Sequence, residues 1–294
     1  MHRIAFSIFG LPVYFYGIML VCGVIGAYLT VVLTNRRARI STPEVLLDCV
    51  VWILLAGLAG ARLAYVMLNW DHYSSNPVSV LNLRSGGLTL YGSLVAGFAA
   101  FIVFCRIKKL PVLKMLDLFA PAVLVGIAFG RVGCFLNGCC YGVPAPPPFG
   151  VVFADAGIPG ARYPIQLYET FLCLLGAAFL LWFERKRRFD GESFLMFACI
   201  YALVRFSTEF IRGIDSSSVF FGLTLAQTFS LLVILSCIGV SFVLRGRAAE
   251  GAGNAGMAPE AKVESGEDAG AGRSGKRQGK RSGGRSGRKS SGRR

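Results

Sequence analysis

The residues best suited to chemistry are ionisable side chains that interrupt apolar segments. Arg205, Glu209 and Arg212 are spaced i, i+4 and i+7, so a helix places them on one face with the carboxylate between two guanidiniums. One glutamate cannot neutralise two arginines, and an uncompensated guanidinium suits bidentate binding of a phosphate. Two interpretations stay open, an anion site and an ion-pair network that only locks helices together. Other ionisable residues inside or at the lip of apolar segments are Arg62, Arg131 and Glu169.

Three cysteines also lie close together in the sequence, at Cys134, Cys139 and Cys140. Tetrahedral zinc takes four nitrogen or sulfur ligands, and the only histidines are His2 and His72. The C-x-x-C spacing of redox motifs does not occur. We therefore expect no metal and no other cofactor. A disulfide from Cys134 to Cys139 or Cys140 and a set of small packed thiols are two open alternatives.

The elements that must position these residues are membrane-spanning helices. The 294 residues are 54% hydrophobic and 16% charged, with a mean hydropathy of +0.58, which excludes an ordinary soluble domain. About 20 apolar residues in a helix cross roughly 30 Å of hydrocarbon. The sequence therefore predicts an all-α polytopic membrane protein with seven transmembrane helices. The apolar stretches lie near residues 13–34, 45–68, 87–105, 115–133, 165–183, 193–211 and 222–244.

The loops between these stretches predict the orientation, since short cytoplasmic loops are enriched in lysine and arginine. Three alternate loops carry three or four basic residues each, whereas the segments on the other side carry one or two. This places the N-terminus outside and the C-terminus in the cytoplasm. Most charged residues of the apolar segments then lie towards the outer leaflet. The basic loop residues are Arg36, Arg37, Arg39, Arg106, Lys108, Lys109, Lys114, Arg185, Lys186, Arg187 and Arg188.

Residues 1–244 are predicted to form one transmembrane domain and residues 245–294 a disordered basic tail. The tail holds 13 basic and 5 acidic side chains, so it contributes +8 to the net charge of +15. It is rich in glycine, serine and arginine and has no aromatic residue, so it cannot bury enough apolar surface to fold. Attraction to anionic lipid, at about 1 kcal/mol per basic residue near the surface, is favoured over binding of nucleic acid, which we do not expect.

Several motifs together resemble the prolipoprotein diacylglyceryl transferase family of bacterial inner-membrane enzymes. The two most specific are GRVGCFLNG at 130–138, with Gly142 following, and RFSTEFIR at 205–212. The resemblance covers nearly all of residues 1–244. The other motifs are YFYG at 14–17, AGAR at 59–62, SGGLTLYG at 85–92 and YPIQLYE at 163–169.

The resemblance implies transfer of the diacylglyceryl group of phosphatidylglycerol to a cysteine thiol in the signal sequence of a prolipoprotein. A thioether forms and glycerol 1-phosphate leaves, so the reaction needs cationic donors where negative charge grows on the phosphate. By resemblance, Arg131 binds the phospholipid, and Arg205 and Glu209 line the catalytic cavity. The remaining residues expected to bind substrate are Tyr16, Asn137, Gly142 and Arg212.

Three polar positions differ from the pattern common in this family. Tyr91 stands where many members carry histidine, and Cys134 and Cys139 stand where an asparagine and a glutamate are frequent. We expect Tyr91 to act in catalysis, although its ordinary pKa of about 10 makes it a poor base unless an arginine lowers it. The predicted function is an active transferase. The alternatives are a divergent paralogue that binds or modifies phospholipid differently and an anion transporter.

Overall fold

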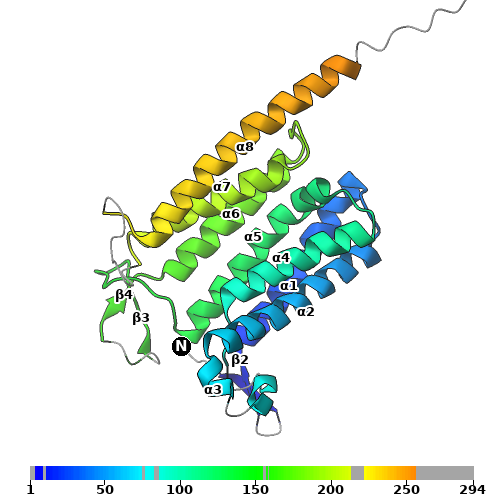
Figure 1. The fold of residues 1–294 in the computed structure, drawn as a ribbon. Helices are drawn as coiled ribbons and strands as arrows, with labels where there is room; N and C mark the ends of the chain where they lie inside the picture. Colours follow the sequence, from blue (N-terminus) through cyan, green and yellow to red (C-terminus); the bar gives the residue numbers. More distant parts are fainter. Residues whose placement is uncertain are drawn as a thin grey trace, which may run out of the picture. The chain divides into compact units, whose positions relative to one another are not determined.

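The computed structural model describes residues 4–8, 11–74, 77–82, 86–154, 157, 159–212 and 222–255. These residues are mostly helical, and each predicted apolar stretch largely coincides with one long helix (Figure 1). The long helices are α1 (Phe15–Ala38), α2 (Pro43–Leu68), α4 (Leu90–Ile107), α5 (Val112–Asn137), α6 (Ile165–Phe183), α7 (Glu192–Glu209) and α8 (Leu225–Ala255). Two short helices, α3 (Trp70–Ser74) and the 3₁₀ helix η1 (Pro77–Leu81), lie between α2 and α4.

Two small antiparallel sheets accompany the helices, so the prediction of a purely helical fold was incomplete. Strand β1 (Ile4–Ile8) pairs with β2 (Leu11–Tyr14), directly before α1. Strand β3 (Val151–Val152) pairs with β4 (Ala161–Arg162) in the connection between α5 and α6. Strands of two to five residues are too short to give a periodic signal in a sequence.

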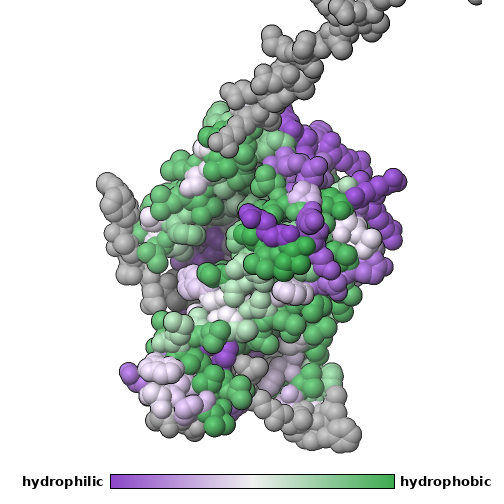
Figure 2. Space-filling view, turned by 45° about the vertical axis from the view of Figure 1, so that its right-hand side comes forward, coloured by the Kyte–Doolittle hydropathy of each residue, from purple (hydrophilic) through white to green (hydrophobic). Residues whose placement is uncertain are grey.

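Six helices of the described residues are long and apolar enough to cross a membrane, namely α1, α2, α4, α5, α6 and the part of α8 from Leu225 to Gly246. Helix α7 falls outside this group because its 18 residues include Glu192, Arg205 and Glu209. Many large apolar side chains are exposed on the spanning helices, as expected of a surface that faces lipid. Figure 2 shows this hydrophobic surface, with hydrophilic residues gathered at one end of the face. The chain is a multi-pass membrane protein.

Helix α5 is the element around which the site is built. It packs extensively against α1, α6 and α7, whereas α2 packs mainly against α4. One apolar core, which includes Phe104 and Met115, joins α1, α2, α4 and α5. A second core, which includes Leu124 and Leu180, joins α5, α6 and α7. The second core fixes the relative positions of α5, α6 and α7. These three helices carry the charged residues, each near one of its ends.

The C-terminal part of the chain is described only in part. Helix α8 continues past residue 245, where the tail was predicted to begin, and ends at Ala255. Contacts divide the chain into the units Met1–Ala252 and Gly253–Arg294. The rest of the predicted tail, residues 256–294, lies outside the described residues.

Arg62 in α2 is buried, and its hydrogen bonds give it a structural role. Its guanidinium donates five hydrogen bonds of 2.7 to 3.1 Å, all to backbone carbonyl oxygens of residues 79–82 and 86–87. An arginine side chain has five N–H donors, so all of them are used. Arg62 therefore fixes the connection that leads into α4 and has no donor left for a phosphate.

Arg62→Lys is expected to lower the free energy of unfolding by roughly 3 kcal/mol, because an ammonium has three donors and leaves buried carbonyl oxygens unpaired. Thermal unfolding of the purified protein in detergent measures the loss. Arg36→Lys, at an exposed position, is the matched control and should change stability by about 0.5 kcal/mol or less. An unchanged unfolding midpoint for Arg62→Lys would show that the five hydrogen bonds contribute little.

Candidate active site

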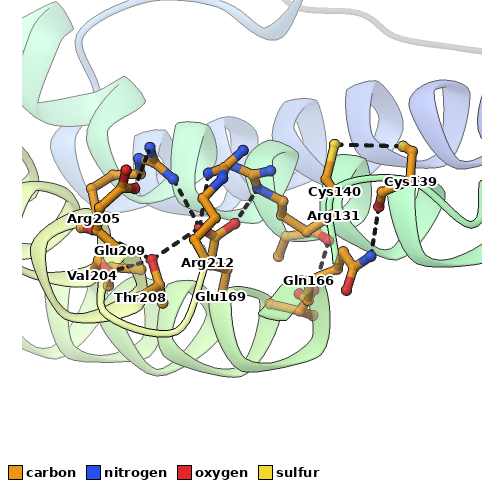
Figure 3. Close-up of polar contacts among 12 residues, drawn as sticks. Arg131, Cys139, Cys140, Gln166, Glu169, Val204, Arg205, Thr208, Glu209 and Arg212 are labelled. Carbon is orange, nitrogen blue, oxygen red and sulfur yellow. Dashed lines mark hydrogen bonds and ion pairs between the residues drawn. The ribbon is translucent and has the colours of Figure 1, made fainter. Parts of the chain in front are cut away.

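Glu169 of α6 lies at the centre of a group of charged side chains (Figure 3). Its carboxylate is 2% exposed, and Oε2 lies 2.5 Å from Nε of Arg131 in α5. Its other oxygen, Oε1, lies 3.2 Å from Nη1 of Arg205 and accepts a hydrogen bond of 3.1 Å from the Thr208 hydroxyl, both from α7. Nη1 of Arg212 lies 3.9 Å from Oε1, which is too far for a hydrogen bond. One buried carboxylate thus gathers three guanidiniums.

A second carboxylate completes what we call the arginine–glutamate cluster, namely Arg131, Glu169, Arg205, Glu209 and Arg212. Oε2 of Glu209 lies 3.3 Å from Nη2 of Arg205. Three guanidiniums face two carboxylates, so the cluster carries one excess positive charge when every group is ionised. The arginine side chains are 18 to 20% exposed, so a ligand can reach them while most of the bulk water is excluded. The cluster ties three helices together and can also bind an anion such as a phosphate.

The cluster brings together four of the residues predicted to act in the site: Arg131, Arg205, Glu209 and Arg212. Each lies near a helix end, since α5 ends at Asn137, α6 begins at Ile165 and α7 ends at Glu209. These ends meet because α5, α6 and α7 pack side by side through their second core. The sequence indicated that such residues share a depth, and the packing places them in contact.

Two further predicted residues lie beside the cluster. The ring of Tyr16, in the first turn of α1, lies against Gly133, half a turn beyond Arg131 on α5. Asn137 is the last residue of α5, and its side chain is hydrogen-bonded to the thiol of Cys139. Both positions border the same end of α5 as the cluster.

Gly142 lies where the segments after α5, before α6 and after α7 meet. Its N–H donates to the carbonyl oxygen of Tyr163 (2.9 Å), and the N–H of Val143 donates to the carbonyl oxygen of Ile211 (3.0 Å). A Cβ atom on Gly142 would overlap that oxygen of Ile211. The glycine is therefore required by a close backbone approach, and the contact also positions Arg212, the next residue along the chain.

Tyr91 is the predicted catalytic residue that the structure does not bring into the cluster. It lies in the first turn of α4, and 76% of its surface is exposed. Within the described part of the chain, no hydrogen bond, ion pair or ring contact joins Tyr91 to the arginine–glutamate cluster. In this conformation, any role of Tyr91 in catalysis would not involve direct contact with the cluster.

Two buried residues of the motif at 163–169 are more central than the sequence suggested. Glu169 was predicted only as one of several ionisable residues, although it contacts all three arginines. Gln166, one turn earlier on α6, is fully buried and donates from Nε2 to the carbonyl oxygen of Cys139 at 2.5 Å. Its Oε1 is buried and has no hydrogen-bond partner among the described residues. The i, i+3 spacing of Gln166 and Glu169, which places both on one face of a helix, was the sequence feature that could have indicated a shared role.

Cys134, Cys139 and Cys140 are free thiols in this structure, and their sulfur atoms all lie within 4.8 Å of one another. Of the two alternatives left by the sequence, the described conformation contains the thiols and not the disulfide. Hydrogen bonds from the thiols of Cys134 and Cys140 lower the pKa of Cys139, which lies beyond the end of α5. Three sulfur ligands at this spacing can hold a metal ion.

Comparison with known proteins agrees with the resemblance seen in the motifs. Residues 3–243 match the family described as "Prolipoprotein diacylglyceryl transferase". Proteins named phosphatidylglycerol–prolipoprotein diacylglyceryl transferase include one from Finegoldia magna, 35% identical over 240 residues, covering 80% of this chain and 93% of its own length. Those from Rhodospirillum rubrum and Enterococcus faecalis are 36% and 34% identical, over 78% and 83% of this chain and 87% and 91% of their own lengths.

The match is continuous from the segment before α1 into α8, so it includes every helix that contributes to the arginine–glutamate cluster. It also includes all three clustered cysteines, Cys134 in α5 and Cys139 and Cys140 in the connection that follows. The relatives cover most of this chain and most of their own lengths, so the similarity concerns the whole membrane domain. The chain therefore belongs to the prolipoprotein diacylglyceryl transferase family.

Proposed function

We propose that this protein transfers the diacylglyceryl group of phosphatidylglycerol to the cysteine thiol of a prolipoprotein signal sequence. The product is a thioether, and glycerol 1-phosphate leaves. Family membership and the names of the relatives support this reaction. The observation that carries it in this chain is the arginine–glutamate cluster, which holds an excess guanidinium near the ends of three packed helices.

The cluster fits the electronic demand of the reaction. The thiolate attacks an sp³ glyceryl carbon, and the C–O bond breaks with its electron pair passing to the phosphate oxygen. Guanidiniums aimed at that oxygen stabilise the growing charge more strongly in a shielded site than in water. We assign Arg131 and Arg212 to the phosphate, whereas Arg205 and Glu209 orient the reacting groups. Tyr16, Asn137 and Gly142 are assigned to substrate binding beside the cluster, near the end of α5.

The proposed setting is the bacterial plasma membrane, with seven spans, the N-terminus outside and the C-terminal tail in the cytoplasm. Helix α7 is counted as the seventh span because its charged residues are paired: Arg205 with Glu169 and Glu209, and Glu192 with Arg245. Paired charges facing a bundle interior are the form in which ionisable residues are tolerated in membranes. The basic residues from 245 onward would then be attracted to anionic lipid.

A reconstituted assay tests the reaction. Purified protein, phosphatidylglycerol and a peptide carrying a signal-sequence cysteine should yield a peptide whose mass is raised by one diacylglyceryl group. The same peptide with serine in place of cysteine is the control and should stay unmodified. In cells, the protein should also restore growth to a bacterium depleted of its own transferase. A well-inserted protein that fails both assays would favour the divergent paralogue.

Gly142→Ala is expected to reduce transfer on the order of 10- to 100-fold, because the new methyl group displaces the backbone at Ile211 and with it Arg212. The rate of peptide modification at saturating lipid measures the effect. Gly239→Ala in α8 is the matched control, since a Cβ atom there meets nothing within 4 Å. If both alanine variants were equally active, the close approach at Gly142 would not position the site.

Tyr91→Phe distinguishes a chemical from a packing role of the exposed tyrosine. A phenylalanine keeps the ring and removes the hydroxyl. If the hydroxyl orients lipid or accepts a proton, the transfer rate should fall on the order of 10²-fold. Initial rates at several lipid concentrations give kcat and KM separately. Turnover equal to that of the unsubstituted protein would exclude any hydroxyl or proton role and leave only packing.

A further inference from the structure

The arginine–glutamate cluster leaves the three neighbouring thiols unexplained. The sulfur atoms of Cys139 and Cys140 are 3.5 Å apart, and all three sulfurs lie within 4.8 Å of one another. The three residues are half-buried, so the sulfurs are shielded but can be reached. Figure 3 shows Cys139 and Cys140 just beyond the end of α5, next to Arg131. The thiols are close enough to Arg131 for an electrostatic interaction.

The backbone is bent so that the sulfurs converge. Gly138 ends α5 with φ 70°, and Cys140 also has a positive φ of 66°, which is uncommon for any residue other than glycine. Such a conformation costs on the order of 1 kcal/mol and needs support from its surroundings. Gln166 supplies it by donating to the carbonyl oxygen of Cys139, whose N–H in turn donates to the carbonyl oxygen of Cys134 (3.1 Å). The convergence of the thiols is thus built into the local fold.

The spacing suits a metal ion held by three thiolates. A zinc–sulfur bond is about 2.3 Å long, so sulfurs that share one zinc ion lie about 4 Å apart. The sulfurs of Cys139 and Cys140 are slightly closer than this, at 3.5 Å, and no pair among the three is more than 4.8 Å apart, so small side-chain rotations would bring all three into place. The prediction from the sequence that no metal binds assumed that zinc needs four protein ligands. Catalytic zinc sites take three protein ligands and leave the fourth position to water or substrate.

We propose that Cys134, Cys139 and Cys140 bind a zinc ion through three thiolates and that the fourth position binds the cysteine thiol of the prolipoprotein. This proposal rests on the transferase function proposed above and adds the group that activates the nucleophile. A thiol that coordinates zinc is deprotonated outright, so no side-chain base is required for it. That requirement had been assigned to Tyr91, which lies outside the cluster.

The step balances without any oxidant or reductant. The substrate thiol loses its proton to solvent when its sulfur binds zinc. An electron pair of that sulfur then forms the bond to the glyceryl carbon, while the C–O bond breaks and its pair goes to the phosphate held by the arginines. Arg131 and Cys134 are spaced i, i+3 on α5, so nucleophile and leaving group are held on one side of the same helix. The thioether sulfur binds zinc weakly and dissociates, and the zinc ion is unchanged.

Metal content gives the first test. Protein produced in medium with zinc and purified without chelator should hold about one zinc ion per chain by elemental mass spectrometry. Cys134→Ser and Cys139→Ser should each lower this at least tenfold. Cys22→Ser is the matched control and should keep the metal, because Cys22 is also half-buried but lies in α1, away from the three thiols in the sequence. Zinc-free protein with intact thiols, or a disulfide among the three cysteines, would overturn the proposal.

Cobalt substitution tests the fourth position without relying on turnover or on folding of a variant. Sulfur-to-cobalt charge-transfer absorption of the Co²⁺-loaded protein should rise by about one third when the cysteine peptide adds a fourth thiolate, and should not rise with the serine peptide. No rise would overturn the assignment of the substrate thiol to the metal. If zinc-free protein still transferred the diacylglyceryl group, the metal proposal would fail while the transferase function stood. Metal and thiol binding without transfer would contradict the transferase function alone.

Discussion

Arg131→Ala is expected to reduce diacylglyceryl transfer by at least about 10²-fold and to weaken the binding of phosphatidylglycerol. Removing one charged donor from a shielded anion site typically costs this much when charge grows in the transition state. The same substitution deprives Oε2 of Glu169 of its 2.5 Å partner, so part of the effect is structural. Peptide modification, a lipid-binding titration and thermal unfolding, measured on one preparation, separate the two contributions.

The double variant Arg131→Gln/Glu169→Gln is the sharper control. It removes both charges of the pair, so it leaves no buried carboxylate without its partner and should unfold closer to the unsubstituted protein. Its transfer activity should nevertheless stay low, because the phosphate has lost its guanidinium. Wild-type rates in Arg131→Ala would contradict the assignment of this arginine to the lipid phosphate.

Glu169→Gln is expected to destabilise the protein by roughly 3–5 kcal/mol, which is the usual cost of removing one partner of a buried ion pair. Three guanidiniums would then share only the carboxylate of Glu209, and their mutual repulsion would no longer be offset at the centre of the cluster. Thermal unfolding should show a fall of roughly 10 °C in the midpoint. Transfer should also fall, since the arginines lose the group that orients them.

Glu209→Gln is the matched comparison for that result. Glu209 contacts Arg205 at 3.3 Å, and its side chain is more exposed than that of Glu169, 9% against 2%. A carboxylate with one arginine contact contributes less to the packing of three helices, so its loss should cost about 1 kcal/mol of stability. Equal destabilisation by the two substitutions would show that the cluster is held together by total charge and not by the central position of Glu169.

The local pattern of the sequence was enough to locate the helices and, apart from the end of α8, which lies eleven residues beyond the predicted one, their boundaries to within about four residues. Hydrophobic length is a property of about 20 consecutive residues, so it can be read without knowing the partner helices. The i, i+4, i+7 spacing of Arg205, Glu209 and Arg212 likewise needs only helical geometry. Family membership followed from motifs at several places in the chain, and the comparisons confirmed it. Helix α7 shows the limit of hydropathy, because its functional charges remove it from the apolar class.

The tertiary structure decided which of the charged residues act together. Arg62 and Arg131 are both arginines within apolar helices, yet one is saturated by backbone carbonyl oxygens and the other faces a carboxylate. The difference depends on which loop folds over each helix, and a sequence pattern carries no such information. Glu169 became central only when α5, α6 and α7 were packed around it. The three thiols converge because Gly138 and Cys140 adopt left-handed backbone conformations. Partner choice depends on the rotation and depth of neighbouring helices, which is why the sequence determined the elements and the packing determined the site.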